Sequence, residues 1–288
     1  MLYPELFTSL EQARWSLSHD IPWDRFEPAR LTDEQALTVK MNAITEWAAL
    51  PATEMFLRDN QADSDFSAFI SIWFYEEQKH SLALMEYLRR FRPALLPTEA
   101  ELHAVRFPAD PAPALETLML HFCGEVRLTQ WYRRAAEWHQ EPVLRQLYDL
   151  ISKDEARHGG AYLKYMQQAL ARTPAEARTA FARMGFLMAS SGRSGKPLHP
   201  TNLHVARQFF PNDTIQSRLP DPGWLERWLD TQIVFDKACE ERVVGAILRN
   251  LSILLGQQFD DLRGLNRYRK SLAAATANQS VQNGPSIR

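Results

Sequence analysis

The stretches YEEQKH at residues 75–80 and KDEARH at residues 153–158 share one pattern. In each, an acidic residue precedes a glutamate, and a histidine stands three positions after that glutamate. Residues three apart lie on the same face of a helix, so each stretch would point a carboxylate and an imidazole in one direction. Four-helix proteins that hold two metal ions use two such Glu-x-x-His pairs and one glutamate from each of two other helices.

Two further glutamates stand at matching distances before these stretches. Glu46 precedes Glu77 by 31 residues, and Glu125 precedes Glu155 by 30. Long helices joined by short turns place such residues at the same level of a bundle. Both glutamates have apolar neighbours, and a buried carboxylate needs a partner because its desolvation is unfavourable. We therefore predict a dinuclear metal site with six ligands: Glu46, Glu77, His80, Glu125, Glu155 and His158.

The predicted ligands also indicate the metal. Four carboxylates and two imidazoles suit iron or manganese better than zinc or copper, so two iron ions are expected, with manganese as the alternative. Histidine ligands usually donate their second N–H to a carboxylate. We expect Asp154 to orient His80 and Glu76 to orient His158, although either acid would also be ordinary on a solvated helix face.

The rest of the sequence predicts an all-α protein. Only 11 of the 288 residues are glycine, and 45% are hydrophobic, which is typical of a globular protein with a large core. Between the second and third long helices, the proline-rich residues 92–113 would form the crossover that joins two parallel neighbours. Pro51 predicts a kink or a local break in the first helix. Apolar spacing predicts the four long helices at about 33–59, 65–91, 114–139 and 142–170.

Additional helices are expected around this core bundle of about residues 33–170. They cover about 5–17, 174–190, 201–210 and 221–255, with a loop at 191–200. No shift in composition marks a second domain, so residues 1–270 are expected to form one domain. Residues 271–288 are rich in small and polar side chains, which predicts a disordered tail.

Composition and charge exclude several function classes. A net charge of −2 gives no reason to expect nucleic-acid binding. Two cysteines do not make a disulfide framework and favour a reducing compartment. The N-terminal residues lack the cationic and apolar regions of a secretory signal, and no uncharged apolar run is long enough to span a membrane. We therefore expect a cytoplasmic protein.

Four segments resemble the soluble acyl carrier protein desaturases, a branch of the ferritin-like di-iron proteins. The resemblance extends over about residues 40–170, and it implies a ferritin-like four-helix bundle in which the six predicted ligands bind iron. It also implies that Asp154 lies beside His80. The segments are ITE at 44–46 with Leu50-Pro51 after it, EEQKH at 76–80, GEVR at 124–127, and DEARH at 154–158 with Ala161, Tyr162 and Lys164 beyond it.

The resemblance also implies an activity and partners. These desaturases are homodimers that use O2 and reduced ferredoxin to introduce a double bond into an acyl chain on acyl carrier protein. They pass electrons inward from a tryptophan through the acid, for which Trp15 and Trp23 are the candidates here. A threonine three residues after the third-helix glutamate handles the oxygen chemistry in the family. Leu128 stands at that position in this chain, so Thr129 is the nearest candidate for the catalytic role.

Two alternative functions use the same metal site. One is a di-iron oxidase or oxygenase that acts on another small apolar substrate. The other is a non-enzymatic, ferritin-like iron-binding protein, although the helices after residue 175 do not suit a storage shell. An acyl substrate would need an apolar channel beside the metals, with Gly124 and Gly159 leaving space. Candidates to line that channel, which would equally suit the core, are Trp47, Phe69, Trp73, Met119, Phe122 and Leu128.

Overall fold

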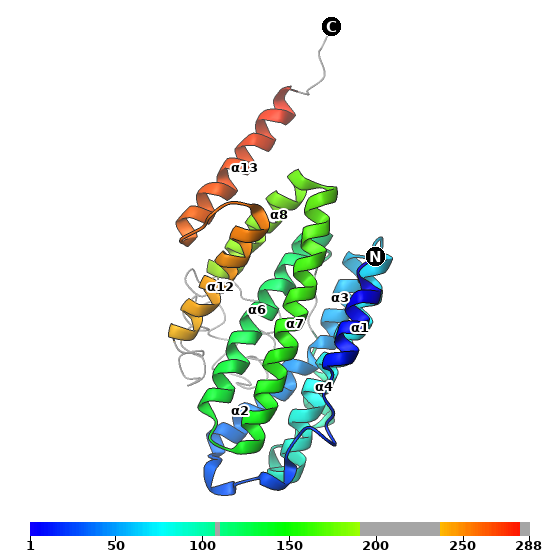
Figure 1. Ribbon diagram of the computed structural model, residues 1–288, viewed down its shortest axis with the longest axis vertical. Coiled ribbons are helices and arrows are strands. Elements are labelled where there is room, and N and C mark those ends of the chain that lie inside the picture. Colours follow the sequence, from blue (N-terminus) through cyan, green and yellow to red (C-terminus); the bar gives the residue numbers. More distant parts are fainter. Residues whose placement is uncertain (107–109, 191–236, 283–288) are drawn as a thin grey trace.

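The computed structural model describes residues 1–106, 110–190 and 237–282, and every regular element in these ranges is a helix. Four long rods form the central bundle as two antiparallel pairs (Figure 1). The first consists of α2 (Asp33–Trp47) and α3 (Ala49–Asp59), and the others are α4 (Ser64–Phe91), α6 (Ala114–Trp138) and α7 (Pro142–Arg172). The prediction of an all-α bundle is confirmed.

The first rod breaks at Ala48, three residues before the proline that the sequence singles out. Thr32 begins the rod with a capping box, in which its side chain and that of Gln35 satisfy each other's backbone N–H groups. Pro51 lies in the first turn of α3, where no N–H is needed for an intrahelical bond. In one continuous helix its ring would clash with the carbonyl of Trp47, so the helix ends there and restarts.

The connection between α4 and α6 carries the chain from one helix pair to the other. It contains the 3-10 turn η3 (Pro93–Leu95) and the short helix α5 (Glu99–His103). Thr98 starts α5 with a second capping box, paired with Glu101. The predicted crossover therefore exists, and it lets α6 and α7 form an antiparallel pair beside that of α2 and α4.

At the N-terminus, α1 (Tyr3–Ala13) lies along α4, and two 3-10 turns follow it, η1 (Trp23–Arg25) and η2 (Pro28–Arg30). In the C-terminal part, α8 (Pro174–Ser190) and α12 (Lys237–Leu255) pack against α6 and α7. The last helix, α13 (Leu262–Gln282), packs against α8 and extends beyond the bundle (Figure 1). The predicted loop at 191–200, the helix at 201–210 and the first part of the helix at 221–255 lie outside the described residues.

The prediction of a disordered tail from residue 271 is wrong up to Gln282, because α13 continues to that residue. Leu265 anchors this helix in the core, and the Tyr268 hydroxyl accepts a hydrogen bond from Arg178 on α8 at 3.2 Å. The small residues that suggested disorder include a run of alanines, and alanine has the highest helix propensity.

Two apolar clusters fill the bundle at different heights. One gathers side chains such as Phe66 and Phe69 of α4 with Tyr162 of α7, and the other gathers Leu84 of α4 with Leu147 of α7. The two predicted metal-binding stretches, residues 75–80 and 153–158, fall between these levels of α4 and α7. Among the described helices, none has the length and apolar character needed to cross a membrane.

Candidate metal centre

The six predicted ligands meet at the centre of the bundle, and each is at most 4% exposed. They form two overlapping groups of four, within each of which the possible ligand atoms all lie within 4.8 Å of one another. Glu77 and Glu155 belong to both groups. The first group adds Glu46 and His80, and the second adds Glu125 and His158. Each of the four rods therefore contributes to this candidate metal centre.

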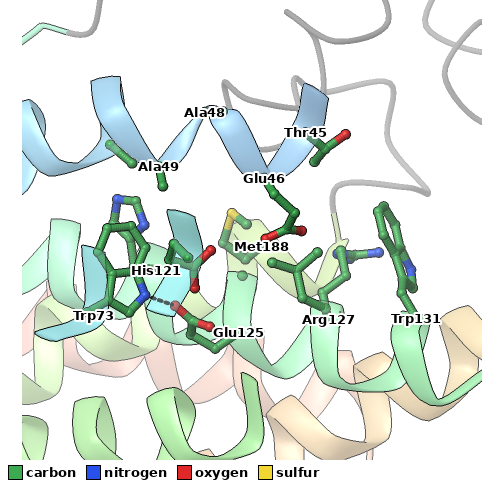
Figure 2. A pocket seen from close by; sticks show the side chains of 14 residues that line it. Thr45, Glu46, Ala48, Ala49, Trp73, His121, Glu125, Arg127, Trp131 and Met188 are labelled. Carbon is green, nitrogen blue, oxygen red and sulfur yellow. Dashed lines mark hydrogen bonds between the residues drawn. The ribbon is translucent and has the colours of Figure 1, made fainter. Parts of the chain in front are cut away.

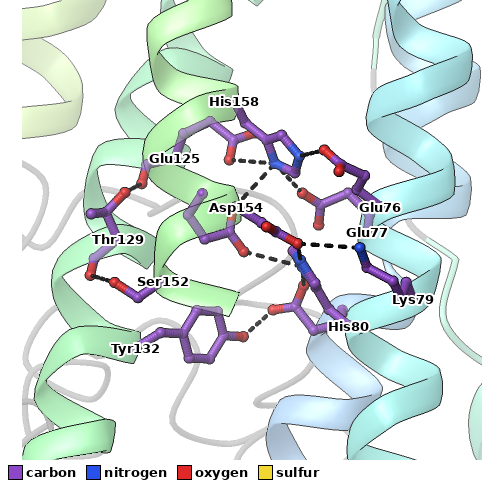
Figure 3. Close-up of polar contacts among 12 residues, drawn as sticks. Glu76, Glu77, Lys79, His80, Glu125, Thr129, Tyr132, Ser152, Asp154 and His158 are labelled. Carbon is purple, nitrogen blue, oxygen red and sulfur yellow. Dashed lines mark hydrogen bonds and ion pairs between the residues drawn. The ribbon is translucent and has the colours of Figure 1, made fainter. Parts of the chain in front are cut away.

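The inner ring nitrogens define the geometry of the two groups (Figure 3). His80 Nδ1 lies 3.4 Å from Glu46 Oε2 and 3.4 Å from Glu155 Oε1. His158 Nδ1 lies 3.0 Å from Glu77 Oε1, 3.5 Å from Glu125 Oε2 and 3.6 Å from the second oxygen of Glu155. Glu155 thus faces both imidazoles, whose ring centroids are 6.0 Å apart.

The atoms that face the centre lack hydrogen bonds. Within the part of the chain that the structure describes, each of the six residues has at least one buried oxygen or nitrogen without a hydrogen-bond partner. These atoms include both Nδ1 atoms and both oxygens of Glu155. Buried polar atoms are normally satisfied, so a cluster of unsatisfied donors and acceptors around one point fits a site built for cations.

Electrostatics support the same interpretation. Burial and the nearby negative charge of Glu155 raise the pKa of Glu77 to about 8. Burial and Glu155 also raise the pKa of Glu125 well above its ordinary value. For His80 and His158, burial acts to lower the pKa, but the outer bonds to Asp154 and Glu76 and the nearby ligand carboxylates outweigh it and raise the pKa of both rings. The free site therefore binds protons, which two divalent cations would replace.

The outer nitrogens of both histidines bond to the acids that precede the ligand glutamates. His80 Nε2 lies 3.0 Å from Asp154 Oδ2, and His158 Nε2 lies 2.9 Å from Glu76 Oε2. This is the crossed pairing expected from the sequence, since each acid sits on the opposite helix from its histidine. Burial acts to raise the pKa of Asp154, but its bond with His80 and nearby cations hold that pKa below the usual range. Asp154 therefore remains a carboxylate that fixes the ring orientation.

Asp154 connects the centre to the N-terminal segment. The indole Nε1 of Trp15 donates a hydrogen bond of 2.7 Å to Asp154 Oδ2, so Trp15 is the better placed of the two tryptophan candidates. The indole of Trp23 donates instead to the carbonyl of Leu17. Lys79 places its ammonium 4.4 Å from the centroid of the Trp15 ring and 3.6 Å from Asp154.

Two contacts to the ligands were not anticipated from the sequence. The hydroxyl of Tyr132 donates to Glu46, and the indole of Trp73 donates to Glu125 Oε1 at 2.9 Å. Tyr132 lies seven residues after Glu125, two helical turns along the same face of α6, which is a signal that could have identified it. Trp73 was considered only as a candidate to line a channel.

Thr129 does not lie where its predicted catalytic role requires. Its hydroxyl donates to the backbone carbonyl of Glu125 at 2.7 Å, as helical threonines often do. Leu128, one position earlier, lines the cavity beside the centre, whereas Thr129 does not. A shift of one residue turns a helical side chain by a large angle around the helix, so the threonine cannot substitute for Leu128.

A cavity of about 70 Å³ lies between the α2–α3 junction and α6 (Figure 2). Glu46, Glu77 and Glu125 form part of its wall, so an occupant would lie against the candidate metal centre. Of the residues proposed to line a channel, Trp73, Leu128 and Gly124 do so. The others pack elsewhere: Phe69, Met119 and Phe122 in the large apolar cluster, Trp47 beside Ile44 and Ala48, and Gly159 in a separate depression.

Comparison with known families supports the resemblance seen in the sequence. Residues 130–189 match the fatty acid desaturase family model. The matched desaturase segment covers about a fifth of the chain, from the second half of α6 to nearly the end of α8. It includes Asp154, Glu155 and His158. No curated protein is significantly similar to the chain.

Proposed function

We propose that this protein is an O2-dependent di-iron oxidoreductase of the desaturase-like type. The observation that carries the proposal is the convergence of four carboxylates and two imidazoles into two overlapping groups of four potential ligands. The fatty acid desaturase match over residues 130–189 supports this reading, since it contains one of the two Glu-x-x-His pairs. A non-enzymatic iron store has no comparable support.

In this proposal, Glu46 and His80 would help to hold one ion, Glu125 and His158 would help to hold the other, and Glu77 and Glu155 belong to both groups of four. The carboxylate-rich set favours iron, with manganese as the alternative. When bound, the iron pair would supply the O2-dependent chemistry that breaks an unactivated C–H bond. The protein would keep water away from that chemistry, because the site lies between two apolar clusters.

Electron supply is proposed to follow Trp15, Asp154 and His80. The Trp15 indole and the His80 ring both hydrogen-bond to the same oxygen, Asp154 Oδ2, at 2.7 Å and 3.0 Å. A ferredoxin-type donor would dock near the N-terminal segment that carries Trp15. The family resemblance further implies a homodimer that receives its substrate on acyl carrier protein.

A second candidate function changes only the substrate. The cavity beside the carboxylates measures about 70 Å³, about half the volume of an engineered cavity of about 150 Å³ that binds benzene. This small volume favours an oxidase or oxygenase acting on a small apolar molecule over an enzyme for a long acyl chain.

One preparation tests both candidates. Iron content is measured first, then the protein is reduced under argon, exposed to O2, and incubated with stearoyl and palmitoyl carrier protein. Two irons per chain and a new double bond would support the desaturase-like function. Two irons that are oxidised without product from either substrate would favour the second candidate.

Matched variants test the site itself. Glu77→Gln removes a charge from the proposed ligand set and should strongly reduce the iron content. Glu54→Gln, an exposed glutamate on the neighbouring helix α3, should leave it unchanged. Full iron content in Glu77→Gln would contradict the assignment.

A further inference from the structure

We propose that the cavity beside the candidate metal centre takes a compact, uncharged apolar group and that Gly124 sets its size limit. This inference rests on the second candidate of the proposed function, an oxidase or oxygenase for a small apolar molecule, because it names the substrate class of that same site. It is carried by the packed aromatic rings at one end of the cavity, by a neutralised guanidinium at the other, and by the open space above one glycine.

One end of the cavity is closed by aromatic rings. Trp73 and His121 line this end (Figure 2). The ring of Phe56 packs against both, with centroids 5.1 Å from Trp73 and 3.7 Å from His121. All three side chains are at most 4% exposed. The hydrogen bond from Trp73 to Glu125 fixes the indole against rotation. A long chain could extend past this end only by displacing a packed aromatic group, which is costly.

The other end carries Trp131 and the buried side chain of Arg127 (Figure 2). Glu240 of α12 accepts hydrogen bonds from both terminal nitrogens of this guanidinium, so α12 is fastened to α6 at this point. Because Glu240 already neutralises Arg127, this end favours an uncharged ligand over a carboxylate. A bidentate pair of this kind is also rigid, since the planar guanidinium matches the carboxylate.

Between the two ends, the wall consists of small residues. Ala48, Ala49 and Ala52 come from the α2–α3 junction, and Gly124 faces the cavity from α6. A Cβ atom built on Gly124 would meet no other atom within 4 Å. A side chain at this position would therefore occupy cavity space rather than clash with the protein. The absence of a side chain at residue 124 is what leaves room for an occupant beside Glu125.

Xenon is a suitable probe because it enters small apolar cavities without needing polar contacts. Metal-free crystals of the wild type, Gly124→Val and Gly160→Ala would be pressurised with xenon. Gly160 is a matched control on α7, since a Cβ there also meets no atom within 4 Å but the residue does not line this cavity. Both substitutions replace a helical glycine by a residue of higher helix propensity, so folding should be retained.

We expect xenon beside Gly124 in the wild type and in Gly160→Ala, and its loss in Gly124→Val. Removing the Met188 side chain, which lines the cavity from α8, should admit benzene that the wild type excludes. Xenon retained in Gly124→Val would overturn the role of Gly124. Stearate bound in the wild type with its chain running past Trp73 would overturn the size limit.

Iron content, measured on the same preparations, separates this inference from the proposed function. Two irons per chain without xenon binding in the wild type would leave the proposed function standing and overturn the inference about the cavity. Xenon binding in a chain that takes up no iron would overturn the proposed function. The cavity would then bind an apolar group, but not beside a pair of metal ions.

Discussion

His80 and His158 occupy corresponding positions in the two halves of the bundle, yet their outer nitrogens meet different surroundings. Asp154, behind His80, is contacted by Trp15, Lys79 and Arg157. Glu76, behind His158, has only Arg157 among the described lysines and arginines within 4 Å, at 3.8 Å. The His80 half is thus connected to the N-terminal segment through Asp154.

The glutamates that complete the two halves differ as well. Glu46 accepts a hydrogen bond from a phenol, and Glu125 accepts one from the indole that closes the cavity. A repeated ligand pattern can therefore serve two separate tasks. Under the proposed function, the His80 half receives electrons, whereas Glu125 in the other half is braced by the wall of the substrate cavity.

The largest expected effect comes from removing a ligand that the halves share. Glu155→Gln should lower the iron content from two per chain to nearly none, because Glu155 faces both imidazoles. Glu46→Gln should lose only one ion, because Glu46 belongs to one group of four. Elemental analysis of the purified variants measures both. An iron retained at full occupancy in Glu155→Gln would show that the residue is not shared.

A smaller effect should separate the two outer acids. Asp154→Asn and Glu76→Gln should each weaken iron binding by roughly 10- to 100-fold, as loss of a carboxylate behind a histidine ligand typically does. Only Asp154→Asn should also slow reduction by a ferredoxin-type donor, because Trp15 bonds to Asp154. Competition with a chelator measures the affinity, and stopped-flow spectroscopy measures the reduction rate. If reduction were slowed equally in both variants, the proposed functional difference between the two halves would be contradicted.

His139 extends the comparison to a buried histidine that has no carboxylate partner. Its ring stacks on Tyr148 at 5.0 Å, and neither nitrogen has a hydrogen-bond partner among the described residues. Burial lowers its pKa to about 3. Below about pH 6.5, the His139 ring binds a proton in the unfolded chain but stays neutral in the folded protein. The free energy of unfolding therefore falls as the pH drops below about 6.5.

Through this histidine, lowering the pH from 7.5 to 5 should decrease the free energy of unfolding by about 2 kcal/mol. In His139→Phe, which keeps the stacking, urea unfolding curves at the two pH values should differ by that much less than in the wild type. An unchanged difference would mean that His139 gains a proton without unfolding.

The smallest effect concerns the phenol in the His80 half. Tyr132→Phe leaves a buried oxygen of Glu46 without its donor and should lower the stability of the metal-free protein by about 1–2 kcal/mol. Thermal unfolding with and without iron measures this cost. Tyr148→Phe, which loses only a contact with Asn42 farther from the ligands, is the control. A larger loss in the control would show that Tyr132 does not support Glu46 specifically.

Helix periodicity explains why much of the centre could be predicted from the sequence. Glu77 and His80 are three residues apart, and Glu46 and Glu125 precede their pairs by almost equal intervals, so local spacing was sufficient. Other contacts between distant segments were beyond local spacing, although the family resemblance offered Trp15 as one of two candidates beside Asp154. Tyr132 meets Glu46 across 86 residues and Trp15 meets Asp154 across 139, and no local pattern determines such meetings.

The errors also have physical causes. Thr129 was preferred for its chemistry, but its position on the helix turns its hydroxyl to the carbonyl of Glu125. The composition of residues 271–282 suggested disorder, yet its alanines continue α13. The break that Pro51 predicts in the first rod is confirmed, and it lies at Ala48 because a proline disturbs the turn before it.

The hydrogen bond between Trp15 and Asp154 places the N-terminal segment in the proposed electron path, although the segment supplies none of the proposed ligands. All six potential ligands lie at or after residue 46, so a chain that begins after Trp15 would retain every one of them. Such a shortened protein would separate iron binding from the reduction of the bound iron. It would test whether the bundle can bind iron without the segment through which electrons are proposed to arrive.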